Sequence, residues 1–230
     1  GVERFESHLT TPEPLDLERH FRNAVESNID FVTMEVSSQA LKYDRVLGVN
    51  FSVAAFLNIG YDHVSSVEHP TWEDYFASKL RIFEQCTYGL VNLDSEHCAE
   101  ILEAAKASKK VITFSEINEA ADFYGYNVHK VGNDIVFNVR GSDFDEEFKL
   151  SMPGLFNVSN ALCAIAIARL YDIPVSDIQT GLYQAKVPGR MEIYSSNDQK
   201  ITAIVDYAHN QLSFQKLFES VRNEYPGYRA

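Results

Sequence analysis

An acidic residue lies at the end of a short apolar run in the first part of the chain. Residues 31–36 are apolar and rich in β-branched side chains, which predicts a short buried strand. Glu35 lies near the carboxyl end of this run, and Ser37 and Ser38 follow where a helix can begin. In an open α/β sheet, ligands bind at the carboxyl ends of strands, where loops and helix N-termini converge. Glu35 is therefore a candidate metal ligand.

A lysine falls on the apolar face of the helix that we expect over residues 71–84. Lys79 shares its stripe with four apolar residues at helical spacing: Trp72, Phe76, Leu80 and Phe83. Two interpretations are open. The side chain can lie along the apolar surface and extend its ammonium to water. Alternatively, burial depresses the pKa of Lys79, and the neutral amine reacts with carbon dioxide to give a carbamate whose oxygens bind magnesium.

Two turns that follow expected strands carry an acid and a histidine. Asp62 and His63 come after the strand expected over residues 49–59. Asp206 is the last residue of the strand expected over residues 201–206, and His209 follows it. A histidine taken singly is more often a surface or hydrogen-bonded residue than a ligand. An acid at the carboxyl end of a strand suits a ribose hydroxyl or a metal, but it equally suits the cap of the next helix.

Three further residues suit a nucleotide. Arg190 follows a Pro-Gly turn, and its guanidinium has the planar geometry that phosphates favour. Asn157 and Asn160 open the long apolar helix expected over residues 157–171. Asn157 can cap that helix or can hydrogen-bond an adenine edge, and the residue types alone leave both roles open.

The elements that must position these residues alternate between helix and strand. The sequence pattern changes at about residue 121. From there to residue 152, short segments of alternating apolar and polar residues, separated by Gly-Asn and Gly-Ser turns, predict an antiparallel meander. We expect an α/β fold, with a mostly parallel sheet wrapped by helices and a small inserted antiparallel sheet. The expected strands are 31–36, 49–59, 88–93, 111–114, 123–130, 134–140, 146–152, 191–194 and 201–206. We expect a first helix that ends at about residue 27, and further helices at 71–84, 95–107, 157–171, 175–183 and 212–223.

Composition narrows the class of protein. The 230 residues carry a net charge of −13, which argues against a nucleic-acid or anionic-membrane surface. The three cysteines are scattered without a Cys-x-x-Cys spacing, as is typical of reduced thiols in a cytoplasmic protein. We expect no signal peptide, and no apolar run in these residues approaches the roughly 18 residues of a membrane helix. We expect a cytoplasmic monomer, and both chain ends look like cuts within a longer protein.

The motifs, taken together and in order, resemble the Mur ligase family, ATP-dependent enzymes that add amino acids to the peptide of peptidoglycan precursors. The resemblance runs from residue 10 to residue 209 and is closest to the tripeptide-synthetase branch. It rests on Thr10-Thr11-Pro12, Met34-Glu35-Val36-Ser37-Ser38, Asn58-x-x-x-Asp62-His63, Tyr75-x-x-x-Lys79, Asn92-x-Asp94, Phe156-Asn157-Val158-Ser159-Asn160, Gly189-Arg190-Met191-Glu192 and Asp206-Tyr207-Ala208-His209.

The resemblance implies a P-loop NTPase-like central domain that binds ATP and two magnesium ions. It implies that the substrate carboxylate is activated as an acyl phosphate, which the incoming amine then attacks, with electrostatic stabilisation supplying most of the catalysis. The implied metal ligands, also assigned to catalysis, are Glu35, His63 and a carbamate on Lys79. The implied nucleotide contacts are Asn157, Asn160, Arg190 and Asp206, and the implied contacts to the UDP-muramoyl peptide are Thr10, Thr11, Ser37 and Arg45.

The chain departs from the family pattern in several places. No Gly-x-x-x-x-Gly-Lys-Ser/Thr phosphate loop is present in these residues, which predicts that they are inactive alone. Gln39, Glu68-His69-Pro70 and Asn210-Gln211-Leu212-Ser213 also differ from the usual residues, which suggests a divergent paralogue. We expect residues 1–210 to form the central domain, and residues 211–230 to form its last helix and the start of a link to another domain. A ligase for another acceptor, of the folylpolyglutamate or cyanophycin type, and a non-catalytic scaffold module remain as alternatives.

Overall fold

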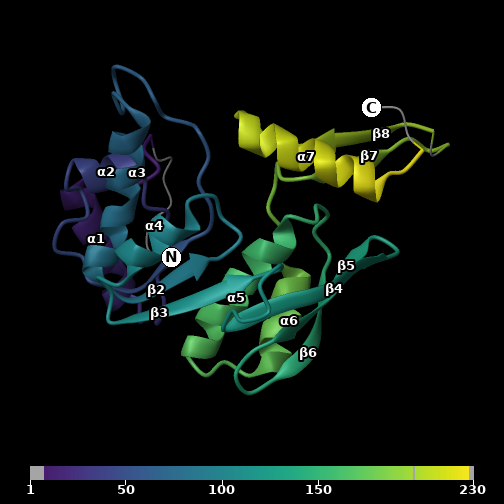
Figure 1. The fold of residues 1–230 in the computed structure, drawn as a ribbon, viewed down its shortest axis with the longest axis horizontal. Coiled ribbons are helices and arrows are strands. Elements are labelled where there is room, and N and C mark those ends of the chain that lie inside the picture. The colour runs from purple at the N-terminus through teal and green to yellow at the C-terminus, as the bar shows by residue number, and fades with distance from the viewer. Residues whose placement is uncertain (1–7, 199, 228–230) are drawn as a thin grey trace.

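The computed structural model describes residues 8–198 and 200–227 (Figure 1). Residues 1–7 and 228–230, which the expected domain division includes, lie outside these ranges. The helices are α1 (Pro14–Glu26), α2 (Ser38–Lys42), α3 (Trp72–Leu80), the 3-10 helix η1 (Arg81–Gln85), α4 (Cys98–Ala105), α5 (Asn157–Leu170), α6 (Val175–Gln184) and α7 (Gln211–Glu224). The strands are β1 (Phe51–Phe56), β2 (Cys86–Asn92), β3 (Lys110–Ser115), β4 (Phe123–Val131), β5 (Asp134–Arg140), β6 (Asp145–Leu150), β7 (Glu192–Ser195) and β8 (Thr202–Val205).

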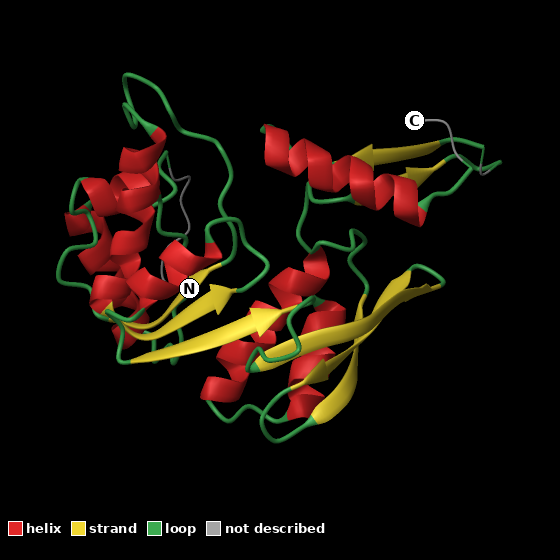
Figure 2. Ribbon diagram, viewed as in Figure 1, coloured by secondary structure: helices red, strands yellow, loops and turns green. Residues whose placement is uncertain are grey.

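Six of the strands form one sheet in the order β1-β2-β3-β4-β5-β6 (Figure 2). The pairs from β1 to β4 are parallel and the pairs from β4 to β6 are antiparallel. The expected fold class, a mostly parallel sheet flanked by helices with an antiparallel insertion, is confirmed. The insertion also continues the main sheet, because β4 pairs with β3 through Phe114 with Phe123 and Ser115 with Tyr124.

Helices cover both faces of this sheet, as two successive residues of β2 show. Leu90 belongs to a core formed with α5 and α6, whereas Val91 belongs to a second core formed with α1, α3 and α4. Successive side chains of a strand point to opposite faces, so the two cores lie on opposite sides of the sheet. This double burial accounts for the continuous apolar runs of the central strands, which lack the alternation of a half-exposed strand.

The expected buried strand at residues 31–36 is wrong. These residues have no regular secondary structure, and Phe31 and Val32 are 59% and 55% exposed. An apolar, β-branched composition favours a strand, but a strand also needs a neighbouring backbone that accepts and donates its hydrogen bonds. Among the described strands, the edge strand β1 pairs with β2 alone. Met34 and Val36 nevertheless pack against the core of α1, α3 and α4.

The strands expected near residues 191–194 and 201–206 are confirmed as β7 and β8. They pair with each other in a separate two-stranded antiparallel sheet, which lies apart from the six-stranded sheet (Figure 1). Helix α7 follows and is tied to the rest of the chain at both ends. At its start, Asn210 Nδ2 donates to Asp62 Oδ2 at 2.8 Å. At its end, the Glu224 carboxylate accepts from the N–H of Gly154 at 3.1 Å and of Leu155 at 3.2 Å.

Two expectations from composition can be compared with the structure. Within residues 8–198 and 200–227, no helix has both the length and the apolar character needed to cross a membrane. The three cysteines, Cys86, Cys98 and Cys163, carry free thiols, as expected.

Candidate active site

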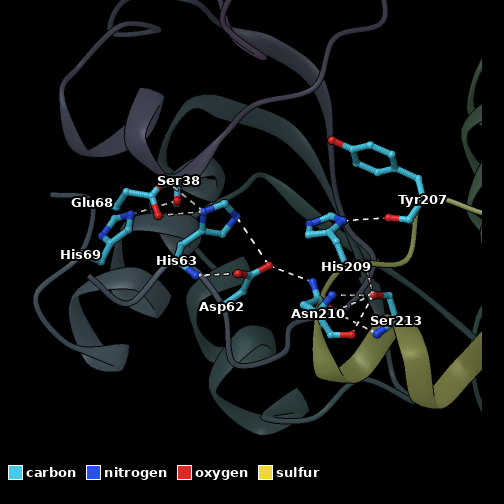
Figure 3. A network of polar contacts seen from close by, with 9 residues as sticks. All are labelled: Ser38, Asp62, His63, Glu68, His69, Tyr207, His209, Asn210 and Ser213. Carbon is cyan, nitrogen blue, oxygen red and sulfur yellow. Dashed lines mark hydrogen bonds and ion pairs between the residues drawn. The ribbon is translucent and has the colours of Figure 1, made fainter. Parts of the chain in front are cut away.

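The loop after β1 brings Asp62 and His63 together with the start of α7. Asp62 Oδ1 accepts the N–H of His63 at 2.8 Å, and Asp62 Oδ2 accepts the amide of Asn210 (Figure 3). The Nδ1 atom of His63 lies 3.3 Å from Glu68 Oε2. Partial burial by itself raises the pKa of Asp62, but the hydrogen bonds from Asn210 and from the His63 N–H outweigh it and hold this pKa below its ordinary value. Asp62 is therefore an anion at neutral pH.

Lys79 lies on α3, in an environment that disfavours its charge. Its Nζ atom lies 5.4 Å from the ring centroid of Tyr75, which is itself only 4% exposed. Burial lowers the pKa of Lys79, and the negative charges of Glu35 and Asp62 oppose this shift without cancelling it. The direction of the shift agrees with the interpretation in which burial favours the neutral amine of Lys79, rather than with an ammonium that extends to water.

The stripe of apolar residues on α3 packs as expected, with a small rotation. Trp72, Phe76 and Leu80 are partly buried and lie against the core of α1, α3 and α4, whereas Tyr75 and Ser78 are the buried residues of the helix. Thr71 caps α3 by accepting the N–H of Asp74. The regular α-helix ends at Leu80, and the expected remainder up to residue 84 continues as the 3-10 helix η1.

The segment that carries Glu35 is fixed by the turn at Thr10 and Thr11. The buried Thr11 hydroxyl donates to the carbonyl of Glu35 at 2.9 Å and accepts the N–H of Ser37 at 2.9 Å. Ser37 in turn caps α2, because its Oγ accepts the N–H of Ala40 at 3.1 Å. Thr10 and the side chain of Glu35 remain exposed. The charges of Glu35 and Asp62 both oppose the lowering of the Lys79 pKa, so both acids lie on segments near Lys79.

Arg45 lies beyond α2 and forms an ion pair at 3.3 Å with Glu13, the residue before α1. Its side chain is 16% exposed. Glu13 closely follows Thr11 in the chain, so this ion pair holds Arg45 near the Thr10–Thr11 turn. The four expected substrate residues therefore come from segments that hydrogen-bond or pair with one another.

The side chains around Lys79 do not form a metal site by themselves. Over residues 8–198 and 200–227, no group of three or more His, Cys, Asp or Glu side chains is placed to hold a metal ion. Magnesium, however, keeps several waters and binds through one or two carboxylates together with substrate phosphates. The Glu35 carboxylate fits that mode, with a carbamate or a phosphate supplying further oxygens, whereas the His63 imidazole offers a nitrogen and its role as a ligand stays a prediction.

The four expected nucleotide residues fall into two neighbouring pairs. Asn157 Nδ2 donates to the carbonyl of Pro153 at 2.7 Å, and Asn160 Nδ2 donates to Asn157 Oδ1 at 3.1 Å. The N-cap of α5 is Phe156, without a side-chain hydrogen bond, so Asn157 does not cap the helix. Its amide is instead held by the preceding loop, which orients the Asn157–Asn160 pair at the start of α5.

Asp206 and Arg190 form the second pair. The Asp206 carboxylate accepts the N–H of Met191 at 2.9 Å and of Ala208 at 2.8 Å, which binds the loop after β8 to the loop before β7. The Arg190 guanidinium lies 5.0 Å from the ring centroid of Tyr207. Helix α7 is capped by Asn210 and not by Asp206, which removes the capping alternative for that acid.

The two pairs are close to each other. A side chain placed on Gly154, just before α5, would meet Met191 Cγ at 3.2 Å, so the loops that carry Asn157 and Arg190 are in contact. Asn210 links the same region to Asp62 and hence to the loop of His63. These contacts connect the segments that carry His63, Asn157, Arg190 and Asp206, which lie far apart in sequence.

Sequence reasoning missed a buried polar network beside this site. His69 is fully buried, with Nδ1 at 2.6 Å from Asp74 Oδ2 and Nε2 at 2.9 Å from Ser38 Oγ. Lys42 Nζ also donates to Asp74 Oδ2, at 2.6 Å. The partners are up to 32 residues apart in sequence, so no local spacing could have indicated them. The one available signal was a histidine in a short turn before a predicted helix start.

The fold is an α/β domain in which the candidate residues Asp62 and His63 lie in the loop after β1 and Asp206 lies in the loop after β8. Residues 1–168 match the family model described as the Mur ligase middle domain. A lysine-adding UDP-N-acetylmuramoyl-L-alanyl-D-glutamate ligase of Streptococcus agalactiae is 39% identical over 99% of this chain and 45% of its own length. A 2,6-diaminopimelate-adding ligase of Clostridium botulinum is 35% identical over 96% of this chain and 45% of its length. The chain belongs to the Mur ligase family.

A solved structure agrees with this assignment at the level of the fold. A UDP-N-acetylmuramoyl-L-alanyl-D-glutamate–2,6-diaminopimelate ligase superimposes with a TM-score of 0.78 at 23% identity, over 93% of this chain and 44% of that chain. The chain thus spans less than half the length of the relatives that it matches. The family model ends inside α5, and the expected division at residue 210 stays a prediction.

Proposed function

We propose that this chain is the central part of an ATP-dependent ligase that adds a diamino acid to UDP-N-acetylmuramoyl-L-alanyl-D-glutamate. The family membership and the names of the relatives at 35–39% identity support this substrate class. The observation that carries the proposal is Lys79, a desolvated lysine on α3 whose Nζ lies 5.4 Å from the ring centroid of the buried Tyr75, with Glu35 and Asp62 near enough for their charges to act on it. We further propose that the protein acts in the cytoplasm as a monomer, where its free thiols stay reduced.

Lys79 is poised to become a ligand for magnesium. Burial favours its neutral amine, whose nitrogen can attack carbon dioxide; the N–C bond forms and the amine proton leaves to solvent. The product is an anion next to Glu35 and Asp62. This added negative charge favours a bound cation, and magnesium, when bound, would be held by Glu35, His63 and the carbamate oxygens and would neutralise part of that charge. Magnesium and ATP, when bound, would supply charge neutralisation and the phosphoryl group.

The remaining residues bind and orient the reactants. Asn157 and Asn160 present amide groups at the start of α5, suited to the hydrogen-bonding edge of adenine. Asp206 suits the ribose hydroxyls, and the Arg190 guanidinium suits a phosphate. Thr10, Thr11, Ser37 and Arg45 line the proposed muramoyl-peptide side, where the buried Thr11 acts by fixing the backbone at Glu35 and Ser37.

In the proposed reaction, an oxygen of the substrate carboxylate attacks the γ-phosphorus of ATP, and ADP leaves. The acyl phosphate is then attacked by the amine of the diamino acid, an amide bond forms, and phosphate departs with that carboxylate oxygen. Cationic groups of the chain, and magnesium when bound, would stabilise the charge that develops on the transferred phosphoryl group. A ligase for a folylpolyglutamate or cyanophycin acceptor would share this chemistry, but the relatives with 35–39% identity are named for the muramoyl substrate.

The test is ligation by the full-length protein that contains this chain. We expect ATP, UDP-N-acetylmuramoyl-L-alanyl-D-glutamate and either lysine or diaminopimelate to give ADP and a product whose mass has increased by one amino-acid residue. Lys79→Ala should lower the rate by at least about 100-fold, the upper end of what loss of an outer-shell partner costs at a metal site. The exposed Lys109→Ala is the matched control. Ligation of folate or cyanophycin acceptors alone would assign the other ligase types, and absence of ligation would leave the scaffold module.

A further inference from the structure

His69 occupies a central place in the polar network beside the proposed site. The imidazole is completely buried, with Ser38 on one side and Asp74 on the other (Figure 3 shows the contact with Ser38). A neutral ring satisfies both contacts when Nδ1 donates to the Asp74 carboxylate and Nε2 accepts the Ser38 hydroxyl proton. Hydrogen bonds from Lys42 and His69 hold the pKa of Asp74 below its ordinary value, so that the carboxylate stays charged.

The order Ser38–His69–Asp74 has the hydrogen-bond pattern of a nucleophilic triad, but it cannot act as one. Ser38 is 4% exposed, and His69 is buried completely. The serine is also the first residue of α2, directly after the capping residue Ser37. A substrate carbonyl therefore has no access to the hydroxyl, and the network must serve the surrounding structure instead.

The three segments that meet at His69 are those that carry the proposed metal ligands. Ser38 follows Glu35 by three residues, and the segment between them is fixed by Thr11. Asp74 lies in the first turn of α3, the helix that carries Lys79. The loop that ends at His69 begins at His63, and Glu68 contacts the ring of His63.

Lys42 adds a second connection between the same three segments. Its ammonium donates both to Asp74 Oδ2 at 2.6 Å and to the carbonyl of Glu68 at 3.1 Å. Lys42 is the last residue of α2. The first residue of this short helix, Ser38, is thus bound to the loop 63–69, and its last residue, Lys42, is bound to that loop and to α3. A five-residue helix has little stability of its own, so its position depends on these contacts.

We propose that His69 is a positioning residue, which holds the segments of Glu35, His63 and Lys79 in the register that metal binding needs. This inference rests on the proposed ligase function. A register between segments needs contacts that cross from one segment to another. The imidazole makes two of these contacts, to Ser38 and to Asp74, and Lys42 makes two more. Its removal should leave each ligand in place along the chain and loosen their mutual arrangement.

Two variants separate the two hydrogen bonds of His69. In His69→Asn, the amide can replace Nδ1 and keep the bond to Asp74; in His69→Gln, it can replace Nε2 and keep the bond to Ser38. We expect each to lower kcat by about tenfold and to raise the magnesium concentration for half-maximal activity by a similar factor, the lower end of the effect of outer-shell partners. At saturating magnesium the KM for ATP should change little, since Asn157 lies at the start of α5 and Arg190 lies before β7, outside the segments that His69 contacts.

The exposed His129→Gln serves as the matched control, and Ser38→Ala should reproduce part of the His69→Asn effect. All measurements use the full-length protein, with magnesium titrations of the ligation rate. Wild-type magnesium dependence in both His69 variants would overturn the proposal and leave His69 as a packing residue. A loss of kcat without any change in magnesium dependence would do the same, because it would place the effect outside the metal ligands.

Amide hydrogen exchange provides a measurement that does not need activity. If the wild-type protein ligates nothing, the proposed function fails, but the coupling by His69 can still be tested. We expect His69→Gln to speed exchange in residues 35–42 and in α3 together, with unchanged exchange in the distant β5. Faster exchange confined to the loop 63–70 would show that His69 does not couple the segments and would overturn the inference.

Discussion

Glu116 carries a buried carboxyl group whose charged form is disfavoured, and its replacement by glutamine should stabilise the protein at neutral pH. The residue follows β3, where burial, reinforced by the negative charge of Asp94, raises its pKa from 4.5 to about 7, although Lys216 on α7 opposes the shift. The Glu116 N–H donates to Asp94 Oδ2 at 2.6 Å, which keeps the two acidic residues adjacent.

The sign and size of the effect follow from proton linkage. Between pH 4.5 and about 7, the folded protein keeps the proton on Glu116 while the unfolded chain has released it. The free energy of unfolding therefore falls as pH rises through this interval. A pKa unit corresponds to about 1.4 kcal/mol, so the shift costs roughly 3 kcal/mol above pH 7. Glu116→Gln removes this cost, because glutamine has no charge to desolvate.

The assay is the free energy of unfolding from urea titrations at low and high pH. Glu116→Gln should match the wild type near pH 4 and exceed it by about 2–3 kcal/mol near pH 8. The exposed Glu96→Gln, from the neighbouring loop, should stay within about 0.5 kcal/mol at both. An equal gain at the two pH values, or a loss near pH 8, would refute the reasoning, since neither depends on the ionisation of Glu116.

Two further predictions concern the ends of α7. Glu224→Ala should lower the free energy of unfolding, measured in urea, by about 3 kcal/mol, because the fully buried carboxylate pairs with Lys130 at 3.1 Å and accepts the Gly154 N–H. The exposed Glu219→Ala is the control, and an equal effect of both substitutions would contradict the role of burial. Asn210→Ala should lower the free energy of unfolding by about 1 kcal/mol, because the helix loses its N-cap, and it should speed amide exchange in the first turn of α7 alone. Exchange that is equally fast along the whole of α7 would show that the cap does not anchor the start of the helix.

Most elements of the fold could be predicted from local sequence, because their patterns have one physical solution. The Gly-Asn turn between β4 and β5 and the alternating strands beside it predicted the meander that the structure contains. Residues 31–36 show where this reasoning stops. Their composition matches a strand, but pairing depends on the neighbouring backbone, which the composition of a single segment does not encode.

The candidate site likewise contains residues that the sequence alone could indicate and residues that it could not. Lys79 could be found because a charge on an apolar helical stripe is visible at helical spacing. His69 could not, since its partners Ser38 and Asp74 are brought to it by tertiary packing of two helices. The direction of the Lys79 pKa shift also needed the structure, because it depends on the balance between burial and the charges of Glu35 and Asp62.

The measurement that tests the central claim most directly follows a single oxygen atom. The full-length protein is given UDP-N-acetylmuramoyl-L-alanyl-D-glutamate labelled with oxygen-18 in its reacting carboxylate, together with ATP and the diamino acid. If the carboxylate is activated as an acyl phosphate, one labelled oxygen appears in inorganic phosphate for each amide bond formed. Phosphate without the label, released alongside the amide, would contradict the account.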